Sequence, residues 1–286
     1  MEDFDLFGLK QVPPLIERIK DSSYDGSVLK KLRNLCAKGR ETQDLIRNSI
    51  PDDFFLANLK ESENLVLVLQ LCNNLCVQNE DSQNRLFPLI TPKFKTIQWT
   101  VPPATAALMF IITCTQPESA FRNQISIDLL EPFFNLPDND ELEFCLITLF
   151  PPIASDVLRY AMSHENLVFI MLDRLHDALE HQPELFDTKT FIADLLSYIK
   201  QDVLPIKQSK SKIVGIFAAF VGCSEPARRE ALNQGAFDII MKTKKIDVND
   251  PILLEWSAAA IRFLEGDIDT DILEEGKKYM ESNEQK

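Results

Sequence analysis

The chain has 286 residues, of which 45% are hydrophobic and only 8 are glycine. This apolar content is sufficient for a folded core, whereas so little glycine disfavours the α/β enzymes, which use glycine in phosphate loops and tight turns. A formal charge of −14 and a pI near 4.7 oppose broad contact with nucleic acid or with an anionic membrane. We therefore expect an all-α protein with no nucleic-acid or membrane partner.

The first clear elements form a repeat at an offset of 40 residues, between 28–50 and 68–90. Identical residues occur at seven aligned positions, Val28/Val68, Leu29/Leu69, Asn34/Asn74, Leu35/Leu75, Cys36/Cys76, Gln43/Gln83 and Ile50/Ile90. Each copy has an apolar helical pattern, a polar corner near Gly39 or Asn79, and a second helix that ends before a proline. We expect Ser27 to cap the first helix. Two helices that meet at a polar corner are the predicted unit.

The middle of the chain continues this helical pattern, and prolines mark the boundaries of its predicted helices. Prolines open predicted helices over 102–114 and 117–134, and a turn then precedes a helix over 141–150. Further along, the apolar face of 166–179 and the pattern of 190–199 predict a pair of partner helices.

The last third returns to the form of the opening repeat. The basic segment KQSKSK at 207–212 is linker-like but too short to divide two domains, and 213–240 repeats the opening pattern at an offset of 185. With a final unit at 250–267, about six or seven units of roughly 40 residues fill the chain, which predicts one solenoid domain over 1–286. The acidic residues at 266–286 are expected to form a cap or tail.

Two features indicate the cellular compartment. The chain opens with MEDFDLFGLK instead of a basic and then apolar signal segment, and its longest apolar region, 104–112, is too short to span a bilayer. Six cysteines lie within apolar helical patterns, which is typical of buried free thiols in a reducing compartment; they are Cys36, Cys72, Cys76, Cys114, Cys145 and Cys223. We therefore expect a soluble, cytoplasmic protein.

The repeats resemble a known family. LRNLCAKGRETQDLI at 32–46 and NNLCVQNEDSQNRLF at 73–87 resemble armadillo repeats, in which an apolar helix ending in Asn-Leu-Cys precedes a polar corner. Together with DVNDPILLEWSAAAIRFLEGD at 247–267, they make the chain similar to the ataxin-10 family, whose Glu-Trp and Ala-Ile-Arg runs recur in the last string. Phe263 departs from the asparagine expected there, and the chain is shorter than family members. The resemblance implies an armadillo/HEAT-like right-handed superhelical solenoid.

The resemblance also implies a function. It points to a non-enzymatic, cytoplasmic scaffold or adaptor that binds one or more proteins and is linked to cytokinesis, cell division and, in animals, neuronal outgrowth. The alternative is an armadillo-type regulator of nucleotide exchange or dissociation on a small GTPase or an Hsp70 chaperone, whose basic surfaces an acidic protein would attract. A third hypothesis, an α-helical enzyme, requires a pocket with convergent carboxylates. No phosphate loop, nucleophile elbow or kinase motif occurs, so we expect no catalytic residue and no cofactor.

Asn34 and Asn74 are the first protein-binding candidates. In armadillo repeats resembling those of importin-α or β-catenin, an asparagine at this position hydrogen-bonds the backbone of an extended peptide. A carboxamide suits this role because it is both donor and acceptor. The aligned positions in later units are Ala219 and Phe263, so any such ladder is confined to the first repeats. The other interpretation is that both asparagines cap helices or bridge neighbouring repeats.

Three further residues are candidates for protein binding. Trp99 follows a basic run and precedes Pro102, and we expect it at the surface, where tryptophans form interaction hot spots. Trp256 is the second candidate, although its apolar helical neighbours favour a core position. Arg262, in the run shared with the family, is the third.

Metal binding is not expected. Cys72 and Cys76 share a helix face, but no histidine lies nearby in sequence, and buried thiols are the more common arrangement. His164 and the following Glu165 lack the second histidine of a zinc-protease helix. The series Asp267, Asp269 and Asp271 begins like a calcium loop but lacks its glycine and its final glutamate.

Overall fold

The computed structural model describes residues 3–21, 24–60, 64–137, 139–201, 204, 206, 208–246 and 250–266. Every regular element among them is a helix, which confirms the predicted all-α class. Internal contacts divide the chain into two compact units, Met1–Leu146 and Ile147–Lys286. The armadillo arrangement, the repeat count and the single domain over 1–286 stay predictions. The predicted acidic tail, apart from Gly266, lies outside the described residues, as does the rejected calcium loop.

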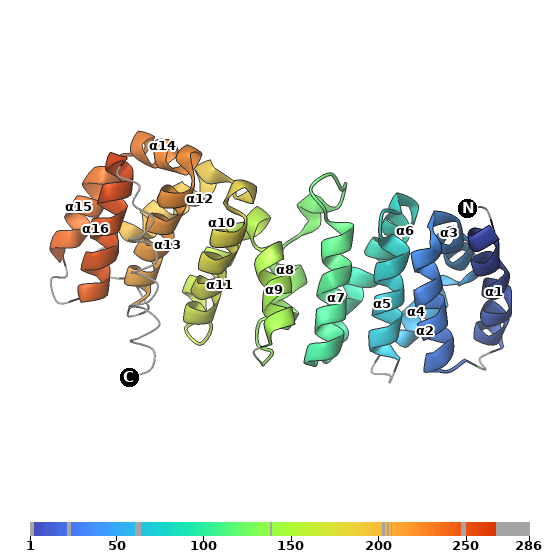
Figure 1. The fold of residues 1–286 in the computed structure, drawn as a ribbon. Coiled ribbons are helices and arrows are strands. Elements are labelled where there is room, and N and C mark those ends of the chain that lie inside the picture. Colours follow the sequence, from blue (N-terminus) through green and yellow to red (C-terminus); the bar gives the residue numbers. More distant parts are fainter. Residues whose placement is uncertain are drawn as a thin grey trace. The chain divides into compact units, whose positions relative to one another are not determined.

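The N-terminal unit consists of short helices packed side by side. Its elements are α1 (Asp3–Lys20), α2 (Gly26–Leu35), η1 (Cys36–Lys38), α3 (Arg40–Ser49), α4 (Asp52–Asn58), α5 (Leu65–Cys76), α6 (Glu80–Ile90), η2 (Thr91–Thr96), α7 (Val101–Cys114), η3 (Arg122–Gln124), α8 (Ile127–Leu130), η4 (Glu131–Phe133) and the first part of α9 (Asp140–Leu149), within which the boundary between the units falls. α5 packs between α2 and α7, and Figure 1 shows the three helices in a row. α3 and α6 follow the polar corners and pack against α5.

Side-chain caps fix where these helices begin. The carboxylate of Asp25 accepts hydrogen bonds from the backbone N–H groups of Ser27, at 3.0 Å, and of Val28, at 3.2 Å. Asp25 is therefore the cap of α2, and the predicted cap at Ser27 is wrong, because the Ser27 hydroxyl itself donates to Asp25. At the second corner, Asn79 caps α6 by accepting from the backbone N–H of Ser82 at 3.1 Å.

The predicted helix over 117–134 is wrong. A turn follows α7, and only short helical pieces occupy this stretch. The Ser119 hydroxyl donates to Cys114 O at 2.5 Å, and the Arg122 guanidinium donates to Thr115 O at 3.1 Å. These side chains satisfy the carbonyls at the end of α7 and so favour a compact turn over a second helix.

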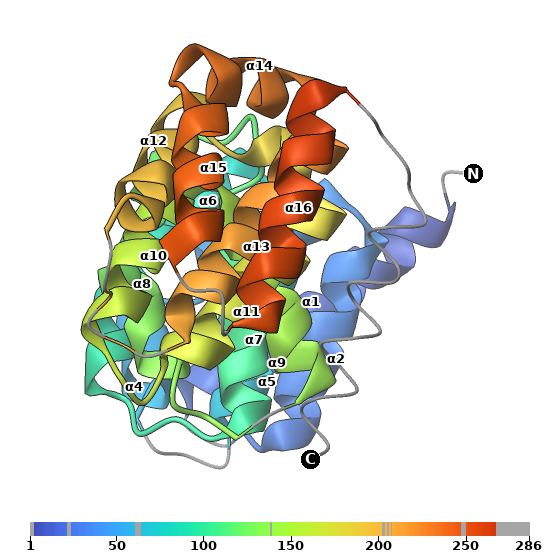
Figure 2. The same cartoon turned by 90° about the vertical axis from the view of Figure 1, so that its left-hand side faces the viewer.

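The C-terminal unit also consists of helices that pack on one another. Its elements are η5 (Pro151–Ile153), α10 (Ala154–Ser163), α11 (Val168–His181), η6 (Pro183–Leu185), α12 (Thr188–Ile199), α13 (Ser209–Cys223), α14 (Glu225–Asn233), α15 (Ala236–Ile246) and α16 (Pro251–Glu265). α13 packs between α11 and α16, and α14 crosses one end of α15 and α16 (Figure 2). Within the linker-like segment 207–212, residues from Ser209 onward form the first turn of α13 instead of a loop.

The contact between α13 and α16 is the closest in this unit because two glycines remove side chains from it. A Cβ atom added at Gly215 would lie 3.2 Å from the Trp256 indole, and one added at Gly222 would lie 3.1 Å from the Phe263 ring. The two glycines are seven residues apart and therefore share a face of α13. The aromatic rings of α16 pack directly on this face.

Five of the six cysteines are buried, as expected, and Cys223 is exposed, which corrects the prediction that all six are buried. All six are free thiols. Burial raises the pKa of Cys36 to about 12 and that of Cys145 to about 11, because a thiolate is poorly solvated in the core. Within the described segments, every helix is too short or too polar to cross a membrane.

Candidate functional site

The described surface of the N-terminal unit has two hollows of interest. The first, which we call the α5–α7 groove, has a volume of about 550 Å³. Its lining residues are Arg33, Val66, Gln70, Asn73, Asn74, Val101, Pro102, Thr105, Ala106, Met109, Asn139 and Glu141. Residues three or four apart on α5 and on α7 share a helix face, so the outward faces of these two helices form most of the groove.

A hydrogen-bond network crosses the groove from α2 to α7. The Arg33 guanidinium donates to Asn34 Oδ1 at 3.0 Å and to Gln70 Oε1 at 2.5 Å. Asn74 Nδ2 donates to the Arg33 carbonyl at 3.1 Å, and the Thr113 hydroxyl donates to Asn73 Oδ1 at 2.6 Å. Asn74 therefore bridges α5 to α2, which is the interpretation that the sequence offered beside the peptide ladder. The ladder itself stays a prediction.

The same network determines what the groove offers to a ligand. The carboxamide oxygens of Asn34, Gln70 and Asn73 all accept hydrogen bonds from within the protein. No hydrogen bond within the described residues uses the amide N–H groups of Asn34 or Gln70 as donors. Met109 adds an apolar surface that is 39% exposed. The groove thus presents N–H donors beside an apolar patch.

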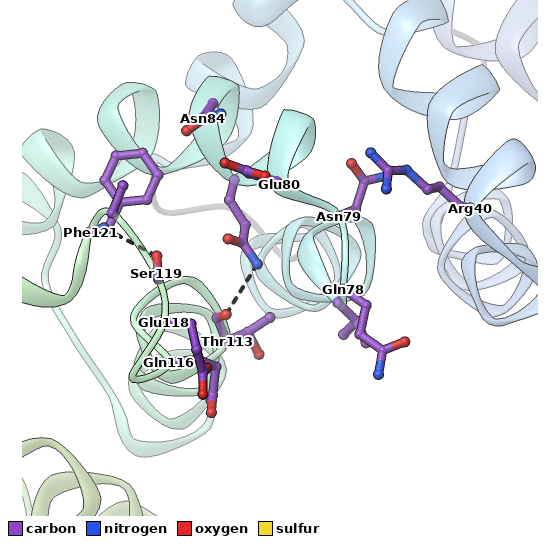
Figure 3. A pocket seen from close by; sticks show the side chains of 13 residues that line it. Arg40, Gln78, Asn79, Glu80, Asn84, Thr113, Gln116, Glu118, Ser119 and Phe121 are labelled. Carbon is purple, nitrogen blue, oxygen red and sulfur yellow. Dashed lines mark hydrogen bonds between the residues drawn. The ribbon is translucent and has the colours of Figure 1, made fainter. Parts of the chain in front are cut away.

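The second hollow, which we call the corner pocket, lies where the α5–α6 corner faces the turn after α7 (Figure 3). Its volume is about 610 Å³, and it is lined by Arg40, Val77, Gln78, Asn79, Glu80, Gln83, Asn84, Thr113, Gln116, Glu118, Ser119, Ala120 and Phe121. Gln78 has a φ of 53°, a left-handed conformation that is uncommon outside glycine. This backbone conformation makes the sharp corner that forms one edge of the pocket.

Gln83 joins two helices at the floor of the corner pocket. Its Nε2 donates to Cys76 O of α5 at 2.9 Å and to Thr113 O of α7 at 3.4 Å. Forty residues earlier, Gln43 Nε2 donates to Asn74 O at 2.9 Å and to Val77 O at 3.2 Å, both at the C-terminal end of α5. The glutamine shared by the two sequence copies therefore binds carbonyls at the C-terminal end of the neighbouring helix in both copies.

Several hydrogen-bond donors of the corner pocket are already in use. The Thr113 hydroxyl donates to Asn73, and the Ser119 hydroxyl donates to Cys114 O and accepts from Phe121 N (Figure 3). Gln116 Nε2 donates to Ile112 O at 2.8 Å. The lining also offers the exposed carboxylates of Glu80 and Glu118, and the side-chain amides of Gln78 and Asn84, which donate no hydrogen bond within the described residues.

The other sequence-predicted residues do not join either site. Trp99 is only 8% exposed, and its indole N–H donates to Phe94 O at 2.9 Å, so the predicted surface position is wrong. Its ring packs 4.9 Å from that of Phe133, a contact that local sequence does not reveal. Trp256 is 4% exposed, which confirms the core interpretation. Arg262 is exposed near the end of α16, and its binding role stays a prediction.

One group of possible metal ligands occurs among the described residues. Ligand atoms of His176, Asp177 and Glu180 lie within 4.8 Å of one another on α11. His176 Nδ1 is 3.8 Å from Glu180 Oε1. Since neighbours on one helical turn commonly gather in this way without an ion, the group does not by itself indicate a metal.

Comparisons with protein-family models, with curated proteins and with solved structures found no significant match. Function must therefore be argued from the two hollows. Sequence reasoning named Asn74 of the groove, and Asn34 next to its lining residue Arg33, but missed the corner pocket. The identity of Gln43 with Gln83 was the available signal, because a polar residue kept between diverged copies indicates a repeated contact.

Proposed function

We propose that this protein is a non-enzymatic scaffold or adaptor that binds an extended segment of another protein in the α5–α7 groove. The observation that carries this proposal is the unused amide N–H donors of Gln70 in the groove that the exposed Met109 side chain also lines, with the unused donors of Asn34 next to the lining residue Arg33. Carbonyl oxygens of an extended backbone are suitable acceptors for these donors, and an apolar side chain of the segment would cover Met109. The preformed network through Arg33 lowers the ordering cost of binding.

We further propose that the helices are armadillo-type repeats. Gln43 and Gln83 each donate to a carbonyl near the C-terminal end of the next helix of the row, which supports this assignment, as does the row formed by α2, α5 and α7. In the other unit, α11, α13 and α16 pack in the same consecutive manner. A role of the ataxin-10 type in cytokinesis, and a cytoplasmic location, rest on the sequence resemblance. The regulator of a nucleotide switch stays the second hypothesis, and accelerated nucleotide release from a GTPase or Hsp70 would favour it.

A charged substitution in the groove tests whether a partner binds there. We expect Met109→Glu to lower the recovery of at least one partner about tenfold in quantitative affinity purification with mass spectrometry, because it places a carboxylate on the apolar patch. Asn34→Ala should act in the same direction by removing donors. Asn74 is left intact because its loss would break the bridge to Arg33.

Leu232→Glu is the matched control, since Leu232 is an exposed apolar residue, at 45%, on α14 of the other unit. This variant should recover partners as the wild type does. Equal recovery by Met109→Glu, Asn34→Ala and the wild type would contradict binding in the groove.

A further inference from the structure

The helices that line the α5–α7 groove change in charge from one edge of the groove to the other. Arg33 of α2 lines one edge, α5 and α7 form the centre, and Glu141 of α9 lines the opposite edge. The α2 sequence GSVLKKLRNL has three basic residues and no acidic one, whereas the α9 sequence DELEFCLITL has three acidic residues and no basic one. Neither α5 nor α7 contains a charged residue. The groove therefore has a basic edge, a neutral centre and an acidic edge.

The charge of the basic edge is not neutralised within the described residues. Arg33 is half-buried, and its Nε, Nη1 and Nη2 atoms donate to the neutral carboxamide oxygens of Asn34 and Gln70. A guanidinium group has five N–H groups, so two of them are left for a carboxylate. Lys30 and Lys31 are exposed, and no carboxylate of the described residues pairs with either lysine or with Arg33.

The acidic edge is held in place by the cap of α9. Asn139 Oδ1 accepts hydrogen bonds from the backbone N–H groups of Glu141, at 3.1 Å, and of Leu142, at 3.2 Å. Asp140 and Glu141 are exposed, and neither pairs with a cation of the described residues. The dipoles of α2 and α9 oppose the side-chain charges at the two edges, but each contributes only about half a charge. The side chains therefore determine the sign of each edge.

The neutral centre favours an apolar residue of the bound segment. Met109 is 39% exposed there, and Val66 and Val101 are half-buried beside it in the lining. A charged side chain at this position would lose water without gaining an ion pair, which costs free energy.

We propose, on the basis of the proposed function, that the α5–α7 groove selects a partner segment in which an apolar residue separates acidic residues from basic residues. The acidic residues pair with Arg33 at the α2 edge, the apolar residue covers Met109, and the basic residues pair with Glu141 at the α9 edge. A uniformly acidic or uniformly basic segment would meet a like charge at one edge. The order of charges therefore sets the position of the segment in the groove.

The width of the groove sets the spacing of these charges. Packed helices lie about 9 Å apart, so the axes of α2 and α9, at the two edges, are about 27 Å apart. Side chains reach inward from both edges and leave about 20 Å, which an extended chain covers with about six residues. The peptide acetyl-Asp-Asp-Ser-Gly-Leu-Gly-Ser-Lys-Lys-amide has this spacing and is the probe.

The experiment is an NMR titration of the full ¹⁵N-labelled chain with this peptide. We expect saturable shifts of the Gln70 side-chain amide and of the Met109 backbone amide. Arg33→Gln should weaken the peptide about fivefold, in the range measured for ion pairs near a surface, but should leave the affinity unchanged for a peptide with asparagine in place of aspartate. Glu141→Lys should also weaken the peptide about fivefold, and a peptide with glutamate in place of lysine should regain that loss on this variant.

Glu118→Lys is the matched control for Glu141→Lys. It makes the same change of charge at an exposed residue of the same unit, outside the lining of the groove. This variant should bind the peptide as the wild type does. Far-UV circular dichroism during heating verifies that all three variants are folded.

The outcomes separate this proposal from binding in the groove as such. If a peptide with asparagine and glutamine in place of its charged residues binds as tightly as the charged peptide, the selection by charge is overturned while binding in the groove stands. Equal weakening by Glu118→Lys and Glu141→Lys, or no saturable shift up to about 20 mM peptide, would also overturn it. The proposed function is judged separately, by the partners that Met109→Glu loses.

Discussion

Cys36 illustrates how burial controls a single side chain. It follows the last turn of α2 with 2% of its surface exposed, and its Sγ donates to Leu32 O at 3.3 Å. Desolvation raises its pKa from 9.0 to about 12. The folded protein therefore keeps this thiol protonated at a pH at which the unfolded chain ionises it.

We expect Cys36→Ala to reduce the loss of stability at alkaline pH. The raised pKa means that the contribution of Cys36 is fully present below pH 9.0 and is lost progressively as the pH rises from there to about 12. At pH 10 one such thiol lowers the free energy of unfolding by about 1.4 kcal/mol. Urea unfolding at pH 7 and pH 10 measures the difference, and equal losses in the wild type and the variant would show that Cys36 is not responsible.

The two tryptophans show what local sequence could and could not reveal at this scale. Trp256 has apolar neighbours at helical spacing, and its core position was predictable from them. Trp99 follows charged residues, but Phe133, 34 positions later, packs against its ring. A contact at that separation leaves no local pattern. The corner pocket was missed for the same reason, since its lining comes from separate segments of the chain.

At the scale of elements, prolines and apolar spacing located most helices. The predicted helices over 102–114 and 141–150 agree with α7 and α9 to within a residue, because proline or turn residues mark where each begins. The helix over 117–134 failed because Pro117 indicates only that a helix is able to start there. The side chains of Ser119 and Arg122 instead donate hydrogen bonds to backbone carbonyls at the end of α7, and these bonds favour a turn over a helix.

The close contact of α13 with α16 gives a test of packing. We expect Gly222→Val to destabilise the protein by about 1–3 kcal/mol, because its Cβ would lie 3.1 Å from the Phe263 ring and valine adds two methyl groups. The better helix propensity of valine offsets only a few tenths of this cost. Chemical denaturation measures the change.

A compensating substitution identifies the cause of that loss. Phe263→Leu opens space opposite Gly222, so the double variant should be more stable than the sum of the two single changes predicts. Additive losses would mean that the Phe263 ring is not what limits residue size at position 222.

At the scale of the whole molecule, the division into two compact units bears on cooperativity. Each unit buries its own apolar core and contains one tryptophan, Trp99 in Met1–Leu146 and Trp256 in Ile147–Lys286. In helical-repeat proteins, stability is roughly a sum of local terms and neighbour terms. Destabilising one unit therefore need not unfold the other at the same denaturant concentration.

We expect Gly222→Val to shift the unfolding of the C-terminal unit more than that of the N-terminal unit. Trp256→Phe leaves Trp99 as the fluorescent reporter of the first unit, and Trp99→Phe leaves Trp256 as the reporter of the second. With Gly222→Val added to each background, the urea midpoint reported by Trp256 should fall further than that reported by Trp99, because the overpacked contact lies between α13 and α16. Equal shifts for the two reporters would instead mean that residues 1–286 unfold as the single cooperative domain that the continuous repeat pattern predicts.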